Sequence, residues 1–486
     1  MPTSLVGVFY DDGIYLSLAK SLAEGHGYRL QYLPGAPAGI HYPFGYPLFL
    51  AGLWSLWPDF PDNVVLLRGA NAVLMGAFAA LAFAYLSPRL KVKPWIVALC
   101  VVLATTAIPL VAVATVLFAE PLFLALTAAA CWCCDAAVRV ERDARQPQKA
   151  LRVAIAAGVL AGAAALTRSI GVAVVAGLVL SLLYQKQRRL AVAAGIPAVV
   201  VLLPWMFFVQ AHTAGVEPLL ASNYGTYGAF LKQGGMAWLS LGSLAELARP
   251  LSGIALPPLP LLLKLPLGLV ALAVLVLGVA RLLIDAPALG FTLLCYTAIV
   301  MVWPYQPDRF LWGVLPWLAA AFVAGVHRML TWQPVQRWRQ AAGALAAASV
   351  VIGFLYYQVV VGPAGATSTQ VGISATMNDI LPWIRESTDS SAVIAGEDEA
   401  LIWLYTGRRA VPSFLWRVNG REAESFGPDS LHAWLERSGA THMILTGPGS
   451  DAAPTIDALL ARRPGYLQLV RVWPGQLMAF GIHRGT

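Results

Sequence analysis

The stretch LAVAAGIPAVVVLLPWMFFV, residues 190–209, carries no charged side chain and is long enough to cross a lipid bilayer as a helix. A helix rises about 1.5 Å per residue, so roughly 20 apolar residues cross the hydrocarbon core. Blocks of this kind recur along the chain, in which 58% of the 486 residues are hydrophobic and 12% are charged. Such a chain has too little polar surface to cover itself in water, and it therefore needs lipid as its solvent.

The apolar blocks predict a polytopic α-helical membrane protein with about ten spans. The predicted spans lie near residues 64–86, 95–113, 115–137, 151–166, 169–184, 190–209, 261–281, 288–304, 310–326 and 341–361. Basic residues gather in the loops 89–93, 139–152 and 186–189, which the positive-inside rule places in the cytoplasm. The alternate loops then face outward, above all residues 1–63 and 210–260.

Residues 1–10 precede the first outward loop and contain no apolar run long enough for a span or a signal peptide. The topology therefore predicts a further helix, an eleventh, encoded upstream of Met1. A transcript that begins at Met1 would contradict this prediction.

The composition changes after residue 362, which predicts a membrane domain over 1–362 and an extracytoplasmic soluble domain over 363–486. Gly, Ser, Thr and Pro in 362–376 indicate a linker. Beyond it, helical patterns are expected at 376–387, 400–406, 430–438 and 453–462, and extended ones at 392–395, 442–446, 467–473 and 478–483. Alternating helices and strands predict a small α/β fold.

Charge and cysteine usage exclude two other classes of protein. The net charge is +8, but the basic residues lie in short loops between spans, so the charge reflects topology and not nucleic-acid binding. The five cysteines all lie inside apolar blocks, which favours packing over disulfides or a metal site.

The pair Asp11-Asp12 is conspicuous in a chain with few carboxylates, because an acid near a membrane is costly to keep charged. The apolar residues that follow recur with helical spacing to Ala23, so the pair begins a short interfacial helix. A second short helix is expected to begin after His41 and to run to Trp57. The alternative for Asp11 is that it merely caps the first helix.

Several motifs now stand in a consistent order along the chain. They are Asp11-Asp12-x-x-Tyr15, Gly25-His26-Gly27-Tyr28, Tyr42-Pro43-x-Gly45-Tyr46-Pro47, Ala119-Glu120-Pro121, Thr167-Arg168-Ser169, Pro204-Trp205 and Asp308-Arg309-Phe310. This set resembles the GT-C glycosyltransferases, and more narrowly the bacterial protein-mannosyltransferase and aminoarabinose-transferase group. The resemblance covers the membrane part, and its first-loop block is the most specific. It departs from the family in lacking the first span and in carrying Asp-Asp where many relatives carry Asp-Glu.

The resemblance implies inverting transfer of a sugar from a polyprenyl-phosphate donor to a glycan, lipid or protein acceptor. Asp11 aligns with the family's first-loop acid and is expected to be the base, with Asp12 as its helper. For the lipid phosphate the candidates are Arg168 and Arg309, because guanidinium grips phosphate through two parallel bonds. Lys264 is a weaker third candidate, and a membrane anchor is the alternative for all three.

The predicted substrate pocket contains Tyr15, His41, Tyr42, Tyr46 and Glu120. The alternative for the tyrosines is an interfacial aromatic belt, and the alternative for Glu120 is that it only holds an arginine. No cofactor follows from the residues. A divalent metal ion bound by Asp12 stays open as an alternative.

The predicted location is a bacterial inner membrane, in contact with membrane lipid and with the active site outside the cytoplasm. A transporter or flippase would also have about ten spans, but carriers place their acids near the bilayer midplane. A scaffold without activity is a third hypothesis, in which Asp11 would be a cap alone.

Overall fold

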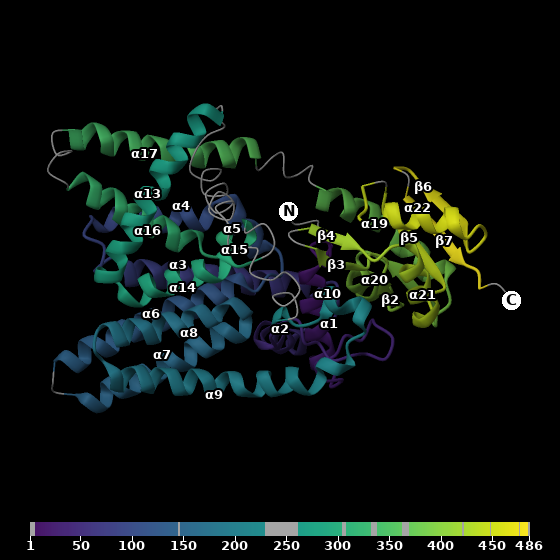
Figure 1. Ribbon diagram of the computed structural model, residues 1–486, viewed down its shortest axis with the longest axis horizontal. Coiled ribbons are helices and arrows are strands. Elements are labelled where there is room, and N and C mark those ends of the chain that lie inside the picture. Colours follow the sequence, from purple (N-terminus) through teal and green to yellow (C-terminus); the bar gives the residue numbers. More distant parts are fainter. Residues whose placement is uncertain are drawn as a thin grey trace.

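The computed structural model describes residues 5–143, 146–228, 261–303, 308–331, 338–361, 369–419, 422–447, 449–475 and 477–484. Figure 1 shows a helical part, drawn on the left, and a smaller part with all the strands on the right. The helices of the larger part are α3 (Val64–Leu86), α4 (Pro94–Thr106), α5 (Ile108–Thr115), α6 (Glu120–Arg142), α7 (Pro147–Thr167), α8 (Val172–Tyr184), α9 (Arg188–His212), α13 (Leu261–Asp285), α14 (Pro287–Met301), α15 (Asp308–Trp312), α16 (Leu315–Leu330) and α17 (Arg339–Tyr356). The π-helical turn η6 (Tyr357–Val361) continues α17.

Each predicted span contains a helix, which confirms the polytopic helical fold. In the described residues, 5 helices are long and apolar enough to cross a membrane by themselves, or 6 if the bent pair α4 and α5 is one span. That pair bends by 58° between Thr106 and Ile108, within the span that the sequence predicts at 95–113. Shorter apolar helices, among them α14 and α16, complete the bundle.

Small residues bring the long helices together. At Gly158 of α7 an added Cβ would lie 2.0 Å from the carbonyl oxygen of Ala194 in α9. At Gly278 of α13 it would lie 1.8 Å from the carbonyl oxygen of Ala321 in α16. Lipid gives no hydrophobic drive between helices, so such close backbone approach supplies the packing contacts that hold them together.

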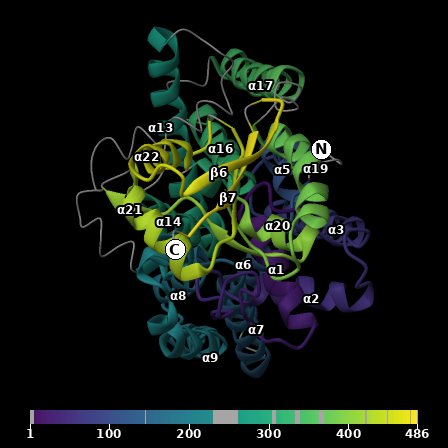
Figure 2. The same cartoon turned by 90° about the vertical axis from the view of Figure 1, so that its right-hand side faces the viewer.

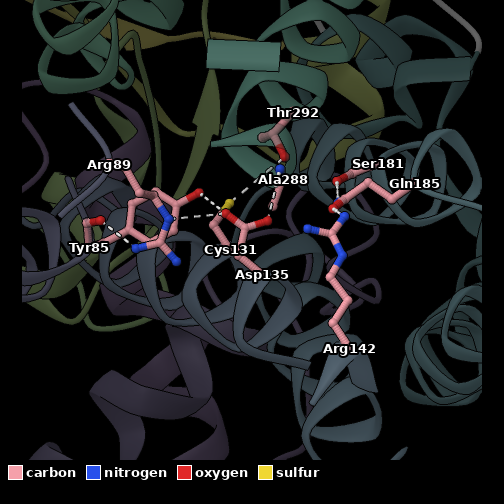
Figure 3. A network of polar contacts seen from close by, with 9 residues as sticks. All are labelled: Tyr85, Arg89, Cys131, Asp135, Arg142, Ser181, Gln185, Ala288 and Thr292. Carbon is pink, nitrogen blue, oxygen red and sulfur yellow. Dashed lines mark hydrogen bonds and ion pairs between the residues drawn. The ribbon is translucent and has the colours of Figure 1, made fainter. Parts of the chain in front are cut away.

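A polar network ties three helices at the end of the bundle that the charge pattern assigns to the cytoplasm (Figure 3). Asp135 of α6 accepts hydrogen bonds from the Tyr85 hydroxyl at 2.8 Å and from the Ala288 backbone N–H at 3.3 Å. Arg89 places its Nε 3.3 Å from the same carboxylate and donates to the Tyr85 carbonyl oxygen at 2.6 Å. We call these residues the Asp135 network; it fixes α6 against α3 and α14.

Two short helices form a layer between the bundle and the strands (Figure 1). They are α1 (Asp11–Ala23) and α2 (Gly45–Leu56), as the apolar spacing predicts. Tyr46 and Leu50 of α2 are fully buried, in one hydrophobic core with α1 and with residues of the C-terminal domain.

The C-terminal domain contains a five-stranded sheet of order β2-β1-β5-β7-β6, in which β1 is parallel to β2 and β5 while β7 is antiparallel to β5 and β6. The strands are β1 (Val393–Gly396), β2 (Arg409–Pro412), β3 (Trp416–Asn419), β4 (Glu422–Ser425), β5 (His442–Leu445), β6 (Leu467–Trp473) and β7 (Leu477–Ile482). The helices are α19 (Thr369–Ser387), α20 (Glu399–Thr406), α21 (Pro428–Ser438) and α22 (Ala453–Arg462). This confirms the small α/β fold.

The boundary with the predicted linker differs from expectation. Helix α19 begins at Thr369, so residues 369–376 are helical and not a linker, while 362–368 lie outside the described residues. The sequence also misses β2 and the hairpin of β3 and β4, each only 4 residues long.

The C-terminal domain is joined to the N-terminal segment and the first outward loop by hydrogen bonds that backbone N–H groups donate. Ala410 of β2 donates to the Tyr32 carbonyl oxygen at 3.0 Å. Leu5 donates to the Ser374 hydroxyl at 2.9 Å, and Val6 donates to the Tyr405 hydroxyl at 3.0 Å. In Figure 2, where this domain faces the viewer, α20 lies beside α1, which it contacts. The domain is therefore built against the loop that carries Asp11.

Candidate active site

A cavity of about 560 Å³ opens where α1, the end of α7 and α15 meet. We call it the arginine cavity. Its lining comes from the first outward loop, the turn after α7, the segment around α10 (Ala221–Tyr224), the end of α14, α15 and β3. The lining includes the predicted site residues Asp11, Tyr15, His41, Tyr42, Arg168 and Arg309. Long-range folding thus brings together six of the residues that the sequence singles out.

Asp11 stands in the first turn of α1 but does not cap it, because no side-chain capping bond forms at this helix start. Its carboxylate accepts a hydrogen bond from the Tyr42 hydroxyl and pairs with the guanidinium of Arg309. Burial alone would raise the pKa of Asp11, but Arg309 and the Tyr42 hydroxyl hold that pKa below its ordinary value. Asp11 is therefore ionised at neutral pH.

Glu120 holds the two arginines of the cavity. It is fully buried in the first turn of α6, and its Oε1 pairs with Arg168 and lies 3.3 Å from the Nε of Arg309. Arg309 also stacks 4.0 Å from the ring centre of Phe118. We call Asp11, Tyr42, Glu120, Arg168 and Arg309 the Asp11 cluster; in it the arginine charges balance the two carboxylates.

The position of Arg168 depends on close backbone packing. An added Cβ at Gly45, the first residue of α2, would lie 2.6 Å from the Leu166 carbonyl oxygen. Glycine therefore lets α2 abut the last turn of α7, just before Arg168. The motif Tyr-Pro-x-Gly-Tyr-Pro needs its glycine for this contact.

Asp12 lies apart from the arginine cavity. It is 1% exposed, and its two oxygens accept the backbone N–H groups of Gly7 at 2.9 Å and Phe9 at 3.1 Å. Burial raises its pKa to about 6, against the opposing effect of these bonds. Its contacts fix the turn that leads into Asp11, and among the described residues no group of three metal-ligating side chains surrounds it.

The predicted aromatic residues divide into lining and support. Tyr15 packs edge-on against Tyr42 and Tyr46, with ring centres 4.8 and 5.1 Å away. Tyr46 is fully buried and does not line the cavity; its hydroxyl lies 3.0 Å from the side-chain nitrogen of Asn71. His41 places Nδ1 2.6 Å from the Gly225 carbonyl oxygen, and burial lowers its pKa. The neutral ring therefore donates from Nδ1.

Lys264 lies near the start of α13. Its side chain falls outside the described part of the structure, so its predicted role in phosphate binding stays a prediction.

The structure adds lining residues that the sequence does not single out, namely Tyr10, Asn223, Tyr227, Trp303 and Trp416. They come from four separate segments, which a sequence read linearly does not connect. Tyr10 carries one local signal, visible only in the structure: its φ of 64° lies in the left-handed region that favours glycine. Such conformations gather at functional sites.

No family model matches the chain, and no curated protein matches its sequence. Solved structures do match its fold. The archaeal oligosaccharyltransferase AglB from Archaeoglobus fulgidus, in complex with an inhibitory peptide and a dolichol-phosphate, matches 99% of this chain and 71% of its own, with 11% identity and a TM-score of 0.54. ArnT from Cupriavidus metallidurans in the apo state matches 96% of this chain and 92% of its own, with 15% identity and a TM-score of 0.53.

Both neighbours are glycosyltransferases with the GT-C fold, and the chain has that fold as the sequence motifs predict. At these identities the likeness concerns the fold. The fold likeness to these membrane glycosyltransferases agrees with the apolar helices of the described residues, which indicate a multi-pass membrane protein.

Proposed function

We propose that this protein is a membrane glycosyltransferase that transfers a sugar from a polyprenyl-phosphate donor to an acceptor hydroxyl, with inversion. The observation that carries the proposal is the Asp11 cluster: an ionised carboxylate and two arginines on the wall of one cavity. The fold supports the reaction class, because glycosyltransferases share it. The dolichol-phosphate named with AglB supports a lipid-linked donor.

In the proposed reaction the acceptor oxygen attacks the anomeric carbon and forms the new glycosidic bond. The bond from that carbon to the phosphate oxygen breaks on the opposite face, and its electron pair leaves with the lipid phosphate. Asp11 takes the proton of the attacking hydroxyl as general base. Arg168 and Arg309 stabilise the leaving phosphate through charge-assisted hydrogen bonds, so the leaving group needs no proton.

In the structure Asp11 is paired with Arg309, so we propose that this ion pair opens before the reaction. A donor phosphate competes with Asp11 for Arg309, because guanidinium forms bidentate bonds with phosphate as it does with carboxylate. Once Arg309 turns to the phosphate, the Asp11 oxygen that it held is free to accept the acceptor proton. Glu120 keeps Arg168 and Arg309 together during this exchange. Asp12 acts as a positioning residue that fixes the preceding turn.

The proposed location is a bacterial inner membrane, with the cavity and the C-terminal domain, residues 363–486, on the extracytoplasmic face. The basic loops between the spans support this orientation. The acceptor is a glycan, a lipid or a protein; a peptide is named with AglB. A transporter is the alternative, but the Asp11 cluster at the edge of the bundle and the fold neighbours favour an enzyme.

The test is transfer from a panel of radiolabelled polyprenyl-phosphate sugars by membranes containing the wild type or Asp11→Asn. We expect the substitution to lower transfer by about 10²- to 10⁴-fold, the contribution of a positioned general base. Asp59→Asn is the matched control, since Asp59 is an exposed acid of the same loop. Unchanged transfer by Asp11→Asn, in a protein that folds, would support a different base; no transfer from any donor would favour the carrier or scaffold.

A further inference from the structure

A second cavity, of about 870 Å³, adjoins the arginine cavity on the side of the C-terminal domain. Except for Tyr10 and Asn223, its lining residues belong to that domain. Tyr10, Asn223 and Trp416 line both cavities, so these three residues form the boundary between them. We call the second cavity the acidic chamber.

The two cavities differ in charge. The lining of the arginine cavity contains the cations Arg168 and Arg309 together with the carboxylate of Asp11. The described lining of the acidic chamber contains the carboxyl groups of Glu397, Asp398 and Asp451, and no Lys, Arg or His. A phosphate therefore has two guanidinium partners in the first cavity and no cationic partner in the described lining of the second. The arginine cavity therefore suits a donor with an anionic leaving group, and the acidic chamber suits a second substrate that carries a positive charge.

The carboxylates of the chamber are only partly used by the protein. Glu397 accepts the Ala452 backbone N–H at 2.9 Å and the Thr446 hydroxyl at 3.3 Å. Asp398 precedes α20 but makes no capping hydrogen bond. Burial, together with Glu399 and Glu397, raises the pKa of Asp398 well above its ordinary range. Asp398 therefore gives up its proton only when a cation lies beside the carboxyl group, and a cationic ligand would supply that cation.

The boundary carries an independent sign of a missing polar partner. Asn223 is 7% exposed, and its side-chain nitrogen donates to the Tyr10 hydroxyl at 3.2 Å. Its side-chain oxygen has no hydrogen-bond partner in the described residues. A buried amide oxygen without a partner is costly, so a turn of the Asn223 side chain toward a hydroxyl or ammonium group of a ligand in either cavity would be favourable.

We infer that the acidic chamber binds the acceptor, and that the acceptor is a short saccharide segment bearing a free amino group. The aromatic side chains Phe414 and Trp416 line the same chamber as the acids. Aromatic rings bind the apolar face of a sugar ring and attract an ammonium group. The acceptor hydroxyl passes Tyr10 and Asn223 to reach Asp11 in the arginine cavity. This inference rests on the proposed function for the direction of transfer, while the binding itself is measured without any donor.

The experiment measures binding of glucosamine trisaccharide to the purified full chain in detergent, with its amines protonated. Its N-acetylated counterpart has the same rings without charge, and trilysine carries the same charge on a peptide. The variants are Asp398→Asn and Asp451→Asn. Asp457→Asn is the matched control, because Asp457 is an exposed acid of the same domain outside the chamber.

We expect the wild type and Asp457→Asn to bind the glucosamine trisaccharide about tenfold or more tightly than the N-acetylated form, since one charge-assisted bond accounts for that factor. Asp398→Asn should remove most of this difference, and Asp451→Asn a smaller share. Equal affinity for both saccharides, an unchanged preference in both variants, or tighter binding of trilysine would overturn the inference. Because no donor is present, these outcomes are independent of whether Asp11 is the base.

Discussion

Two polar clusters lie at opposite ends of one helix, and they are built from the same residue types. Glu120 in the first turn of α6 belongs to the Asp11 cluster, and Asp135 further along α6 belongs to the Asp135 network. At about 1.5 Å per residue, the two carboxylates are separated by roughly 22 Å along the helix axis. Each cluster combines a buried carboxylate, arginine and a tyrosine hydroxyl.

The clusters differ in whether every carboxylate oxygen has a hydrogen-bond partner and in how far the arginine is exposed. Both oxygens of Asp135 accept hydrogen bonds, and the Arg89 side chain is 9% exposed. In the Asp11 cluster, Oε2 of Glu120 has no hydrogen-bond partner among the described residues, and the Arg309 side chain is 33% exposed on a cavity wall. A buried charge alone therefore does not distinguish the proposed active site from the Asp135 network; the accessible cation beside a cavity does.

The comparison predicts its largest effect at the closed end. Arg89→Met leaves Asp135 buried without its cation, which should lower the free energy of unfolding by about 3 to 5 kcal/mol. Thermal unfolding in detergent measures the loss, while transfer per folded molecule should stay near the wild-type value. Arg142→Met is the control, since Arg142 makes an exposed contact with Gln185 at 3.2 Å.

A double variant separates charge burial from packing in that network. Arg89→Met with Asp135→Asn removes both charges; the asparagine oxygen accepts from the Ala288 N–H, and its amide nitrogen donates to the Tyr85 hydroxyl oxygen. The double variant should therefore recover much of the stability that the single variant loses. If the double variant is as unstable as the single one, the ion pair is not the reason for the loss.

At the open end the same type of substitution should act on the reaction. Arg309→Met removes a phosphate donor but leaves Glu120 paired with Arg168 and Asp11 bonded to Tyr42. We expect transfer to fall by about 10²- to 10³-fold, as for loss of one preorganised donor. The unfolding temperature should fall less than for Arg89→Met, because the side chain of Asp11 is 18% exposed and that of Asp135 only 8%. Steady-state transfer beside thermal unfolding measures both. Arg29→Met is the control, because Arg29 is an exposed arginine of the first outward loop. An active Arg309→Met would remove this arginine from the proposed mechanism.

The two ends were unequally predictable from the sequence. The motifs around Asp11, Arg168 and Arg309 predict an outer site, because interfacial acids and outward arginines are rare and their order resembles a known family. The Asp135 network is not predicted: Arg89 lies in a basic loop that the topology already explains, and its pairing with Asp135 depends on how α3 packs against α6. Hydropathy predicts where helices lie but not which faces meet.

The residues at the boundary between the two cavities are even harder to predict from the sequence. Tyr10, Asn223 and Trp416 meet only because the C-terminal domain docks on the first loop, and no local pattern encodes that docking. Asp11 and Asp12 are adjacent in the sequence but have different surroundings. Asp11 lines a cavity, whereas both oxygens of Asp12 accept hydrogen bonds from the backbone N–H groups of Gly7 and Phe9. Adjacent positions on a helix point about 100° apart, and the sequence does not say which one faces the cavity.

A third buried carboxylate sharpens the comparison, with the smallest expected effect. Glu399 is fully buried, and its described hydrogen-bond donors are the hydroxyls of Tyr10 and Tyr224 rather than an arginine. Burial raises its pKa from 4.5 to about 7, although the tyrosines oppose the shift. The folded state then binds the proton more tightly than the unfolded state. The stability from this proton is fully present below pH 4.5 and is lost as the pH rises through about 7.

Between pH 6 and pH 8 the loss should amount to about 1 kcal/mol of unfolding free energy. Glu399→Gln stays neutral and keeps both hydroxyl contacts, so its unfolding temperature should fall less over this interval than that of the wild type. The measurement is thermal unfolding in detergent at both pH values, with Glu386→Gln, an exposed acid of α19, as the control. Parallel curves for wild type and Glu399→Gln would mean that Glu399 is already ionised in the folded protein. The docking of the C-terminal domain on Tyr10 would then resemble the Asp11 cluster, with a buried charge held without its proton.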